Sequence, residues 1–154
     1  MAALLESNEL EALRTPDRVE SLPVESLLRS TDKTAVPTKT SLPGRFRIVP
    51  EPRPVPEALA AQLSRLLLAR SSYADYYTMC IFDPGIVFRF WKGERAVDVL
   101  VCFHCGDLAF QVAGASEALG AKLAFEPMRA ELARLVRASR PGDPRFENLE
   151  DKAS

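Results

Sequence analysis

Residues 76–113 constrain the fold most, because apolar side chains recur there with a period of two and turn signals interrupt them at intervals. Turns are expected at Asp83-Pro84-Gly85, Lys92-Gly93-Glu94-Arg95 and Gly106-Asp107. This spacing predicts four consecutive antiparallel strands. Their expected bounds are residues 76–82, 86–91, 96–105 and 108–113.

A helical period replaces this alternation on either side of the block. Residues 57–70 place their leucines on one side of a helix, and residues 125–140 gather their apolar side chains within one arc. We expect two amphipathic helices, each burying one stripe. The arginines of the second segment are expected to face solvent; they are Arg129, Arg134, Arg137 and Arg140.

These elements predict a two-layer α+β domain of order αββββα, in which a four-stranded antiparallel meander has two amphipathic helices on one face. The expected core face is an apolar set along the strands. Its members are Cys80, Phe82, Ile86, Phe88, Phe90, Val97, Val99, Val101, Phe103, Cys105, Leu108, Phe110 and Val112.

Strand register follows from the turns. A tight turn at Lys92-Gly93-Glu94-Arg95 pairs Phe88 with Val99 and Arg89 with Asp98. A two-residue loop at Gly106-Asp107 would pair Phe103 with Phe110 and Val101 with Val112.

The chain divides into three parts by composition. Every aromatic residue lies at or after Phe46, so residues 1–43 are expected to be a mostly disordered tail. Residues 44–56 contain alternating prolines and are expected to form an extended strap. Residues 57–150 would be the folded domain.

The stretch from Cys102 to Gly106 is the most reactive part of the chain. Cys-x-x-Cys-Gly is compatible with half of a zinc knuckle, with a redox pair, or with a strand end entering a hairpin. In a regular strand Cys105 would point into the core and Cys102 outward, so that the two would not share a ligand. We therefore expect no cofactor, and we expect Cys80 and Cys105 to be buried structural residues.

Two chemical alternatives remain open. A zinc or redox site would use Cys80, Cys102 and Cys105, with His104 as the fourth metal ligand, provided that the chain leaves strand geometry near Cys102. A small enzyme would instead need a pocket that gathers Cys102, His104 and Asp83. No phosphate-binding loop or hydrolase motif accompanies these residues, which favours a non-enzymatic protein.

The strand-end sequence Cys-Phe-His-Cys at residues 102–105, with Cys80 upstream, resembles small bacterial proteins that carry a domain of unknown function with a Cys-Phe-x-Cys motif. Pro127 near the start of the second helix is also similar. The resemblance spans about residues 75–140 and implies no activity or ligand.

Charge and hydropathy exclude several partners. The formal net charge is −1, which gives no basic field for nucleic acid, and no apolar run is long enough to span a membrane. No secretory signal stands out near the N-terminus, so we expect a cytoplasmic protein with free thiols.

The second face of the predicted sheet is too apolar for a solvated surface. Its expected centre consists of Tyr77, Met79, Ile81, Trp91 and Leu100. We expect a cytoplasmic interaction module that uses this face to bind a protein partner or a second copy of the chain.

Overall fold

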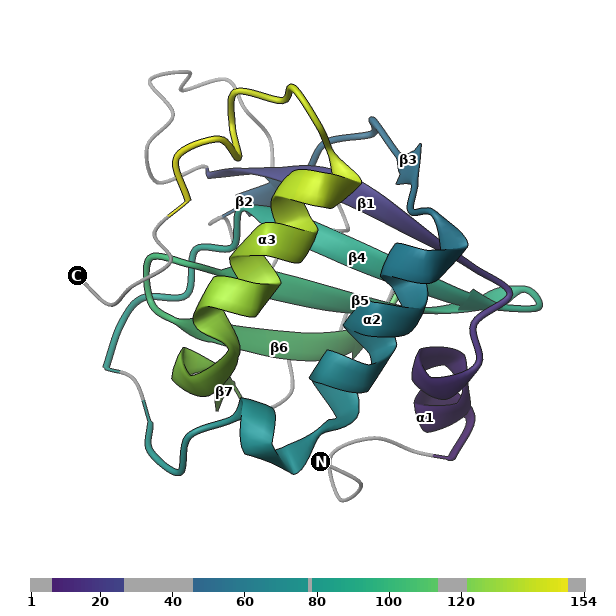
Figure 1. Ribbon diagram of the computed structural model, residues 1–154, viewed down its shortest axis with the longest axis horizontal. Helices are drawn as coiled ribbons and strands as arrows, with labels where there is room; N and C mark the ends of the chain where they lie inside the picture. Colours follow the sequence, from purple (N-terminus) through teal and green to yellow (C-terminus); the bar gives the residue numbers. More distant parts are fainter. Residues whose placement is uncertain (1–6, 27–45, 78, 114–121, 150–154) are drawn as a thin grey trace.

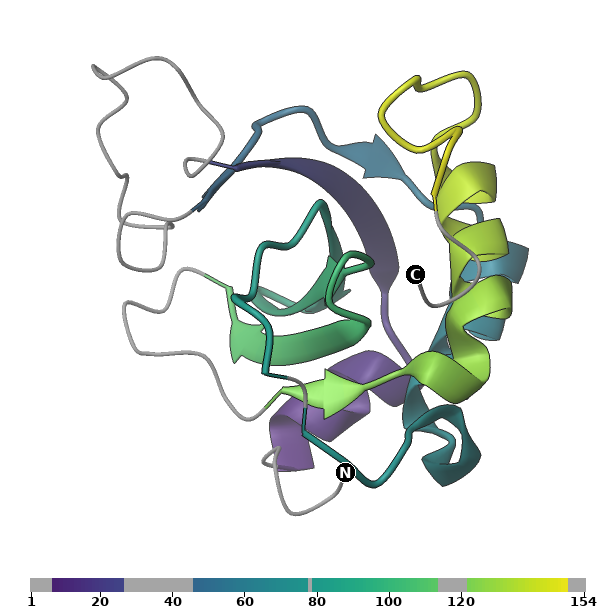
Figure 2. The ribbon, with the colours of Figure 1, turned by 90° about the vertical axis from the view of Figure 1, so that its left-hand side faces the viewer.

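The structure, a computed structural model, describes residues 7–26, 46–77, 79–113 and 122–149. A curled antiparallel sheet forms its centre (Figures 1 and 2). The elements are α1 (Ser7–Arg14), β1 (Arg18–Ser26), β2 (Phe46–Ile48), β3 (Arg53–Pro54), α2 (Glu57–Leu68), η1 (Arg70–Ser72), β4 (Ile86–Lys92), β5 (Arg95–Cys102), β6 (Asp107–Val112), β7 (Leu123–Ala124), η2 (Glu126–Met128) and α3 (Arg129–Ser139).

The sheet has seven strands in the order β2-β1-β4-β5-β6-β7, with β3 also paired to β1. The predicted four-stranded meander of order αββββα is therefore wrong. Three of the predicted strands exist as β4, β5 and β6, whereas the described residues of 76–82 form no strand. The reason is that β1 already occupies the edge of β4 that such a strand would need.

The segment expected to be a tail contributes two further elements. Its described residues, 7–26, form α1 and the long strand β1, whose Val19 and Leu22 are buried. Residues 1–6 and 27–43 lie outside the described part of the chain. The strap also joins the sheet, because Val55 donates its backbone N–H to the carbonyl of Val19 at 2.8 Å.

The predicted β4–β5 register is confirmed: Phe88 lies opposite Val99, and Arg89 lies opposite Asp98. The buried Asp98 carboxylate accepts hydrogen bonds from both Nε and Nη2 of Arg89 at 2.7 and 2.9 Å. This bidentate pair fixes the hairpin on the face away from the helices.

The predicted β5–β6 register is wrong by four residues, because the connecting turn takes up residues 103–106 and β6 starts at once after it. Val101 lies opposite Leu108, and Val99 opposite Phe110. A register shift by an even number of residues leaves every side chain on the same face of the sheet. The predicted core residues of β5 and β6 are therefore confirmed despite the wrong pairing, apart from Val112, which is exposed at the end of β6.

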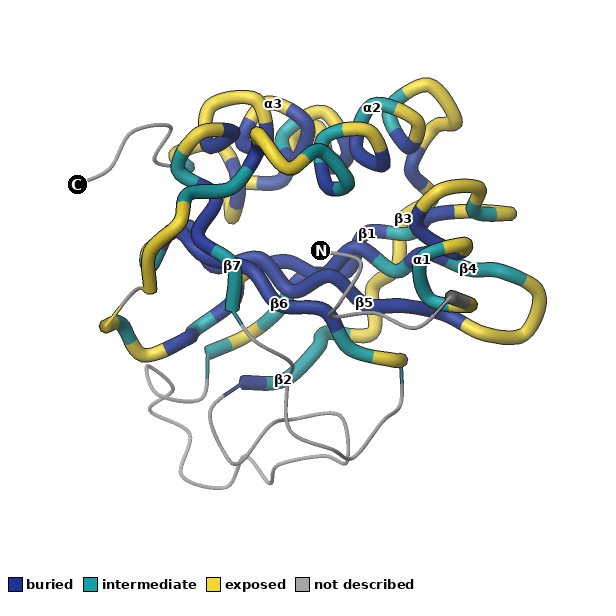
Figure 3. The backbone as a smooth tube through the Cα atoms, turned by 90° about the horizontal axis from the view of Figure 1, so that it is seen from below, coloured by how far each residue is buried: buried dark blue, intermediate teal, exposed yellow. Residues whose placement is uncertain are grey.

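The helices and the sheet enclose the larger core, and we call this side the helix face of the sheet. Figure 3 shows α2 and α3 on one side of the sheet and β2 on the other. Leu63 of α2 and Leu132 of α3 belong to one buried cluster with residues of the strands, among them Phe88, Phe90 and Leu108. The start of α2 at Glu57 is as predicted.

The arginines of the second helix do not share one solvent face. Arg134 is exposed, but Arg129 and Arg140 are buried at the two ends of α3. Arg140 donates to the carbonyl of Ser21 at 2.9 Å, and Arg129 donates to the carbonyl of Phe103 at 2.7 Å. Each buried guanidinium thus bonds a main-chain carbonyl of a distant segment, which a helical stripe does not predict.

A second buried cluster lies on the opposite side of the sheet, and we call it the cysteine face. Val87, Leu100 and Cys102 are fully buried there beneath Phe46 and Phe82. The rings of Phe46 and Phe82 meet edge to face at 6.5 Å between centroids. The apolar second face predicted from the sequence thus exists, and the chain itself covers much of it.

Candidate functional site

The chain leaves strand geometry at Cys102 and closes a turn over residues 103–106 before β6 begins. Gly106 donates its backbone N–H to the carbonyl of Cys102 at 2.9 Å, and its φ of 73° lies in the region that glycine tolerates best. The backbone N–H of Cys105 points at the sulfur of Cys102, 3.4 Å away. The Cys-x-x-Cys-Gly motif therefore forms a compact turn around the Cys102 sulfur.

The helix side of the molecule holds this turn in place. The buried Arg129 guanidinium donates to the carbonyl of Phe103 at 2.7 Å and to Glu126 at 2.8 Å. Phe125 donates its N–H to the carbonyl of Gly106 at 2.9 Å and packs its ring edge to face against Phe103. A turn tied at two carbonyls has little freedom to shift its cysteines.

Cys80 joins the site through a disulfide bond to Cys105, with a Cα–Cα distance of 5.6 Å. This corrects the expectation of free thiols and of two separate buried cysteines. The irregular segment before β4 carries Cys80 past the turn, whereas the predicted strand would have held it in the sheet. Cys102 is the free cysteine among the described residues.

The predicted side-chain directions of the Cys-x-x-Cys pair are also wrong. Cys102 does leave the helix face as expected, but it is fully buried, and Cys105 turns toward it and packs against the cysteine face as well. Strand alternation does not apply beyond Cys102, because residues 103–106 form a turn.

Burial raises the pKa of the Cys102 thiol above its ordinary value, and the nearby negative charges of Asp107 and Asp83 act in the same direction. Hydrogen bonds from the backbone of Asp83 and Cys105 to the sulfur oppose this shift. The thiol is thus mostly protonated near neutral pH, while donors that stabilise a thiolate are already in place.

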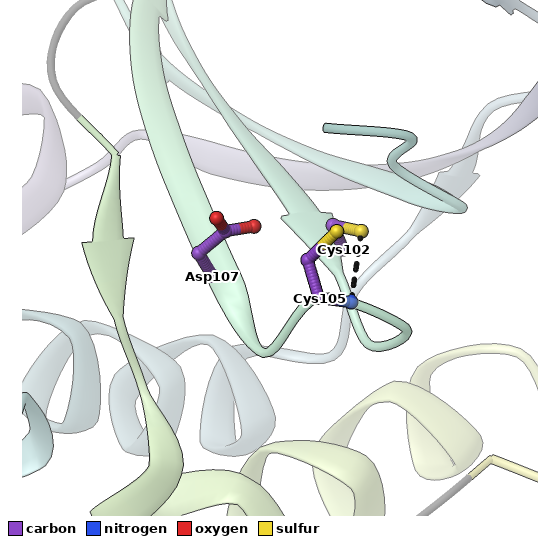
Figure 4. Close-up of side chains that lie close together, drawn as sticks. All are labelled: Cys102, Cys105 and Asp107. Carbon is purple, nitrogen blue, oxygen red and sulfur yellow. Dashed lines mark hydrogen bonds between the residues drawn. The ribbon is translucent and has the colours of Figure 1, made fainter. Parts of the chain in front are cut away.

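Asp107 completes the cluster. The sulfurs of Cys102 and Cys105 and a carboxylate oxygen of Asp107 all lie within 4.8 Å of one another, on one side of the β5–β6 turn (Figure 4). The Lys122 ammonium lies 3.7 Å from the Asp107 carboxylate and donates to the carbonyl of Cys80 at 3.1 Å. Three sulfurs and a carboxylate therefore converge from the β5–β6 hairpin and from the segment that precedes β4.

His104 does not belong to this group of atoms. Its side chain is exposed at the tip of the turn, and it lines a cavity of about 260 Å³ together with Asp83 and Phe146. Cys102 is not among the residues that line this cavity. This cavity therefore brings His104 and Asp83 together but does not include Cys102.

The five residues of the predicted interaction face lie in three different settings. Tyr77, Met79 and Ile81 are exposed on the irregular segment that precedes β4. Leu100 is buried on the cysteine face. Trp91 is partly covered: its indole N–H donates to Glu20 at 2.5 Å, and the Arg18 guanidinium lies 4.5 Å from its ring centroid.

Sequence reasoning missed Asp107, Lys122 and Arg129 as members or supports of the site. Asp107 was assigned to the turn, although an aspartate that opens an otherwise apolar strand is a usable signal of a buried polar role. Lys122 and Arg129 carry no local signal, because long-range contacts alone bring them to the turn.

Comparison with known proteins gives no matching family model, no matching curated protein and no matching solved structure. Within the described ranges, no helix combines the length and the apolar character that crossing a bilayer requires.

Proposed function

We propose that this chain is a non-enzymatic protein-binding module whose contact surface is the segment that carries Tyr76, Tyr77, Met79 and Ile81, here called the exposed segment. The observation that carries the proposal is the exposure of these side chains: 53%, 88%, 101% and 59%. The rest of the described chain buries most of its large apolar side chains on the two faces of the sheet. A local group of exposed apolar side chains is characteristic of an interaction site.

Contacts before and within the exposed segment support this proposal. The Tyr73 hydroxyl donates to the carbonyl of Leu67 at 2.6 Å, and the Ala74 N–H donates to the carbonyl of Ala124 at 2.9 Å. Within the segment, the Lys122 ammonium donates to the carbonyl of Cys80 at 3.1 Å, a contact that does not need the disulfide. A contact surface that is ordered in advance loses less conformational entropy on binding.

The partner that fits this surface is a protein with its own apolar contact area, either a second copy of the chain or another protein. The formal net charge of −1 supplies neither a field for nucleic acid nor strong repulsion between copies. A cytoplasmic location remains part of the proposal, and there the cysteines would be kept reduced.

Site-specific photocrosslinking tests the proposal while the partner is still unidentified. A photoreactive amino acid placed at Tyr77 or Met79, in cells that naturally express the chain, should yield discrete protein adducts. The matched control is Val112, which is also an exposed apolar residue, at 43%, but lies on β6. No adduct at Tyr77 and Met79, or the same adducts from Val112, would contradict the proposal.

Thiol–disulfide exchange is a second candidate, favoured by the proximity of the Cys102 sulfur to the bonded sulfur of Cys105. Attack by the Cys102 thiolate on Cys105 would form a Cys102–Cys105 bond and release Cys80 as a thiolate. The raised pKa of Cys102 makes this attack slow near neutral pH. Mass-spectrometric mapping tests it: a peptide with the Cys102–Cys105 linkage supports exchange, and Cys80–Cys105 alone contradicts it.

A further inference from the structure

We infer that the reduced protein holds a zinc ion between the thiolates of Cys80, Cys102 and Cys105 and the carboxylate of Asp107. This site shares Cys80 with the exposed segment, but it does not depend on the chain binding a protein partner. The oxidised form with the Cys80–Cys105 disulfide and the zinc form are then alternative states of one cluster.

The geometry of the donors is the first argument. Zinc prefers four ligands in a tetrahedron with Zn–S bonds of about 2.3 Å, which places neighbouring sulfurs about 3.8 Å apart. The Cys102, Cys105 and Asp107 ligand atoms already lie within 4.8 Å of one another. Cys80 is bonded to Cys105, so its sulfur stays next to that group when the bond is cleaved. The zinc form requires the four side chains to rotate until their ligand atoms surround one ion.

The shape of the Cys-x-x-Cys-Gly turn also favours a metal site. Its backbone wraps around the Cys102 sulfur, with the N–H of Cys105 donating to that sulfur and Gly106 at a positive φ. Asp83 supplies a further backbone hydrogen bond to the same atom. Hydrogen bonds of this kind orient a ligand and stabilise its anionic form, as surrounding groups do in metal sites.

The surroundings of Asp107 favour a bound cation as well. Its side chain is buried at the start of β6, where a charged group needs compensation. Lys122 lies 3.7 Å from the carboxylate, and a divalent cation would add a second source of positive charge. Three thiolates and one carboxylate carry four negative charges, two of which zinc neutralises, and Lys122 offsets a third.

The chemistry of loading the site balances with one added reagent. A phosphine reduces the Cys80–Cys105 bond to two thiols and is itself converted to its oxide with one water molecule. Zinc then replaces the thiol protons of the three cysteines, which pass to the solvent. Soft thiolate donors favour zinc over magnesium or calcium.

Cobalt substitution of the full chain tests this inference. Protein that has been reduced with a phosphine and stripped with a chelator should bind one cobalt per chain under anaerobic conditions. The complex should show thiolate-to-cobalt charge transfer and the intense visible bands of tetrahedral cobalt, and one equivalent of zinc should bleach both. Protein that keeps the disulfide should show neither feature. Absence of these bands in the reduced protein would overturn the inference.

Variants identify the ligands. Cys102→Ser and Asp107→Asn should each weaken zinc binding at least about tenfold in competition with a chromophoric chelator. His104→Ala should bind zinc as the wild type does, since the His104 side chain is exposed at the tip of the turn. Retention of wild-type affinity in Asp107→Asn, or loss of binding in His104→Ala, would contradict this ligand set.

X-ray absorption of the zinc-loaded wild type does not depend on whether the variants fold. Its first coordination shell should fit three sulfurs and one oxygen. A shell without sulfur, or one with imidazole nitrogen, would overturn the assignment.

Discussion

The two faces of the sheet are both buried, but they are buried by different means. On the helix face, α2 and α3 pack continuous apolar stripes against the strands. On the cysteine face, the cover consists of the short strand β2, the ring of Phe82 and the segment tied by the Cys80–Cys105 disulfide. A face covered by irregular pieces therefore depends on cross-links, whereas a face covered by helices depends on packing.

Matched leucines in neighbouring strands give the sharpest contrast between the faces. Leu108 on the helix face and Leu100 on the cysteine face are both completely buried. Leu108→Ala should lower the free energy of unfolding by about 4 kcal/mol and Leu100→Ala by about 2.5 kcal/mol, because irregular cover collapses more readily into a cavity. Urea unfolding measures both losses. Equal losses, or a greater loss for Leu100→Ala, would contradict this difference between the two faces.

The single Cys80–Cys105 disulfide should contribute a comparable amount to the free energy of unfolding. It closes a loop between residues 25 apart in the sequence, for which the loop-entropy model gives about 3.5 kcal/mol. Reduction in the presence of a metal chelator should therefore lower the free energy of unfolding by about this amount. Cys80→Ser serves as the control, since its stability should not respond to the reductant; a response there would assign the effect to another cause.

The buried ion pair at the end of α3 belongs to the helix face and should respond to acid. Hydrogen bonds from Arg145 above all, and also from Arg140, hold the pKa of the Asp143 carboxyl far below its ordinary range. Asp143→Asn should lower the free energy of unfolding at neutral pH by about 3 kcal/mol, because Arg140 remains buried without its charged partner.

The sign of the pH dependence follows from the lowered pKa. The unfolded carboxyl titrates near pH 4, so its stabilisation is fully present above that pH and is lost as the pH falls toward the folded value. Wild-type stability should drop more steeply than that of Asp143→Asn between pH 5 and about pH 2. Parallel curves for the two proteins would show that the carboxyl does not provide the acid-sensitive stability.

The smallest expected effect concerns the turn that carries Cys105. A side chain at Gly106 would require a strained φ and would also contact the Arg129 guanidinium, which holds the Phe103 carbonyl. Gly106→Ala should lower the unfolding free energy by about 2 kcal/mol, against about 1 kcal/mol for Gly93→Ala, where φ is also positive but space is open. Thermal unfolding compares the two, and a larger loss for Gly93→Ala would contradict the role given to Arg129.

The same contrast explains which parts of the fold were predictable. The helix face follows from periodicity: the leucines of α2 and the alternation in β4 and β5 mark it, and the Phe88–Val99 pairing follows from one tight turn. The β5–β6 turn was misjudged because glycine after Cys105 signals a turn without giving its length. Wrong pairing still left Phe110 on the correct face, since the shift was even.

Periodicity and turn signals do not predict how the cysteine face is covered. β1 contains Pro23 and lies in a segment without aromatic residues, so its composition resembles a tail more than a strand. Its pairing with β4 displaced the predicted strand at residues 76–82 and thereby brought Cys80 to Cys105. Because the sequence does not reveal this long-range pairing, it predicts neither the disulfide nor the cluster at Asp107.

Hydrogen exchange of backbone amides tests whether cross-linking holds the cysteine face while packing holds the helix face. Reduction in the presence of a chelator should accelerate exchange at Gly85 and Gly106, whose N–H groups bond to the carbonyls of Val101 and Cys102, more than at Ala60 in α2. Unchanged exchange at all three positions, or equal acceleration in α2, would contradict the account.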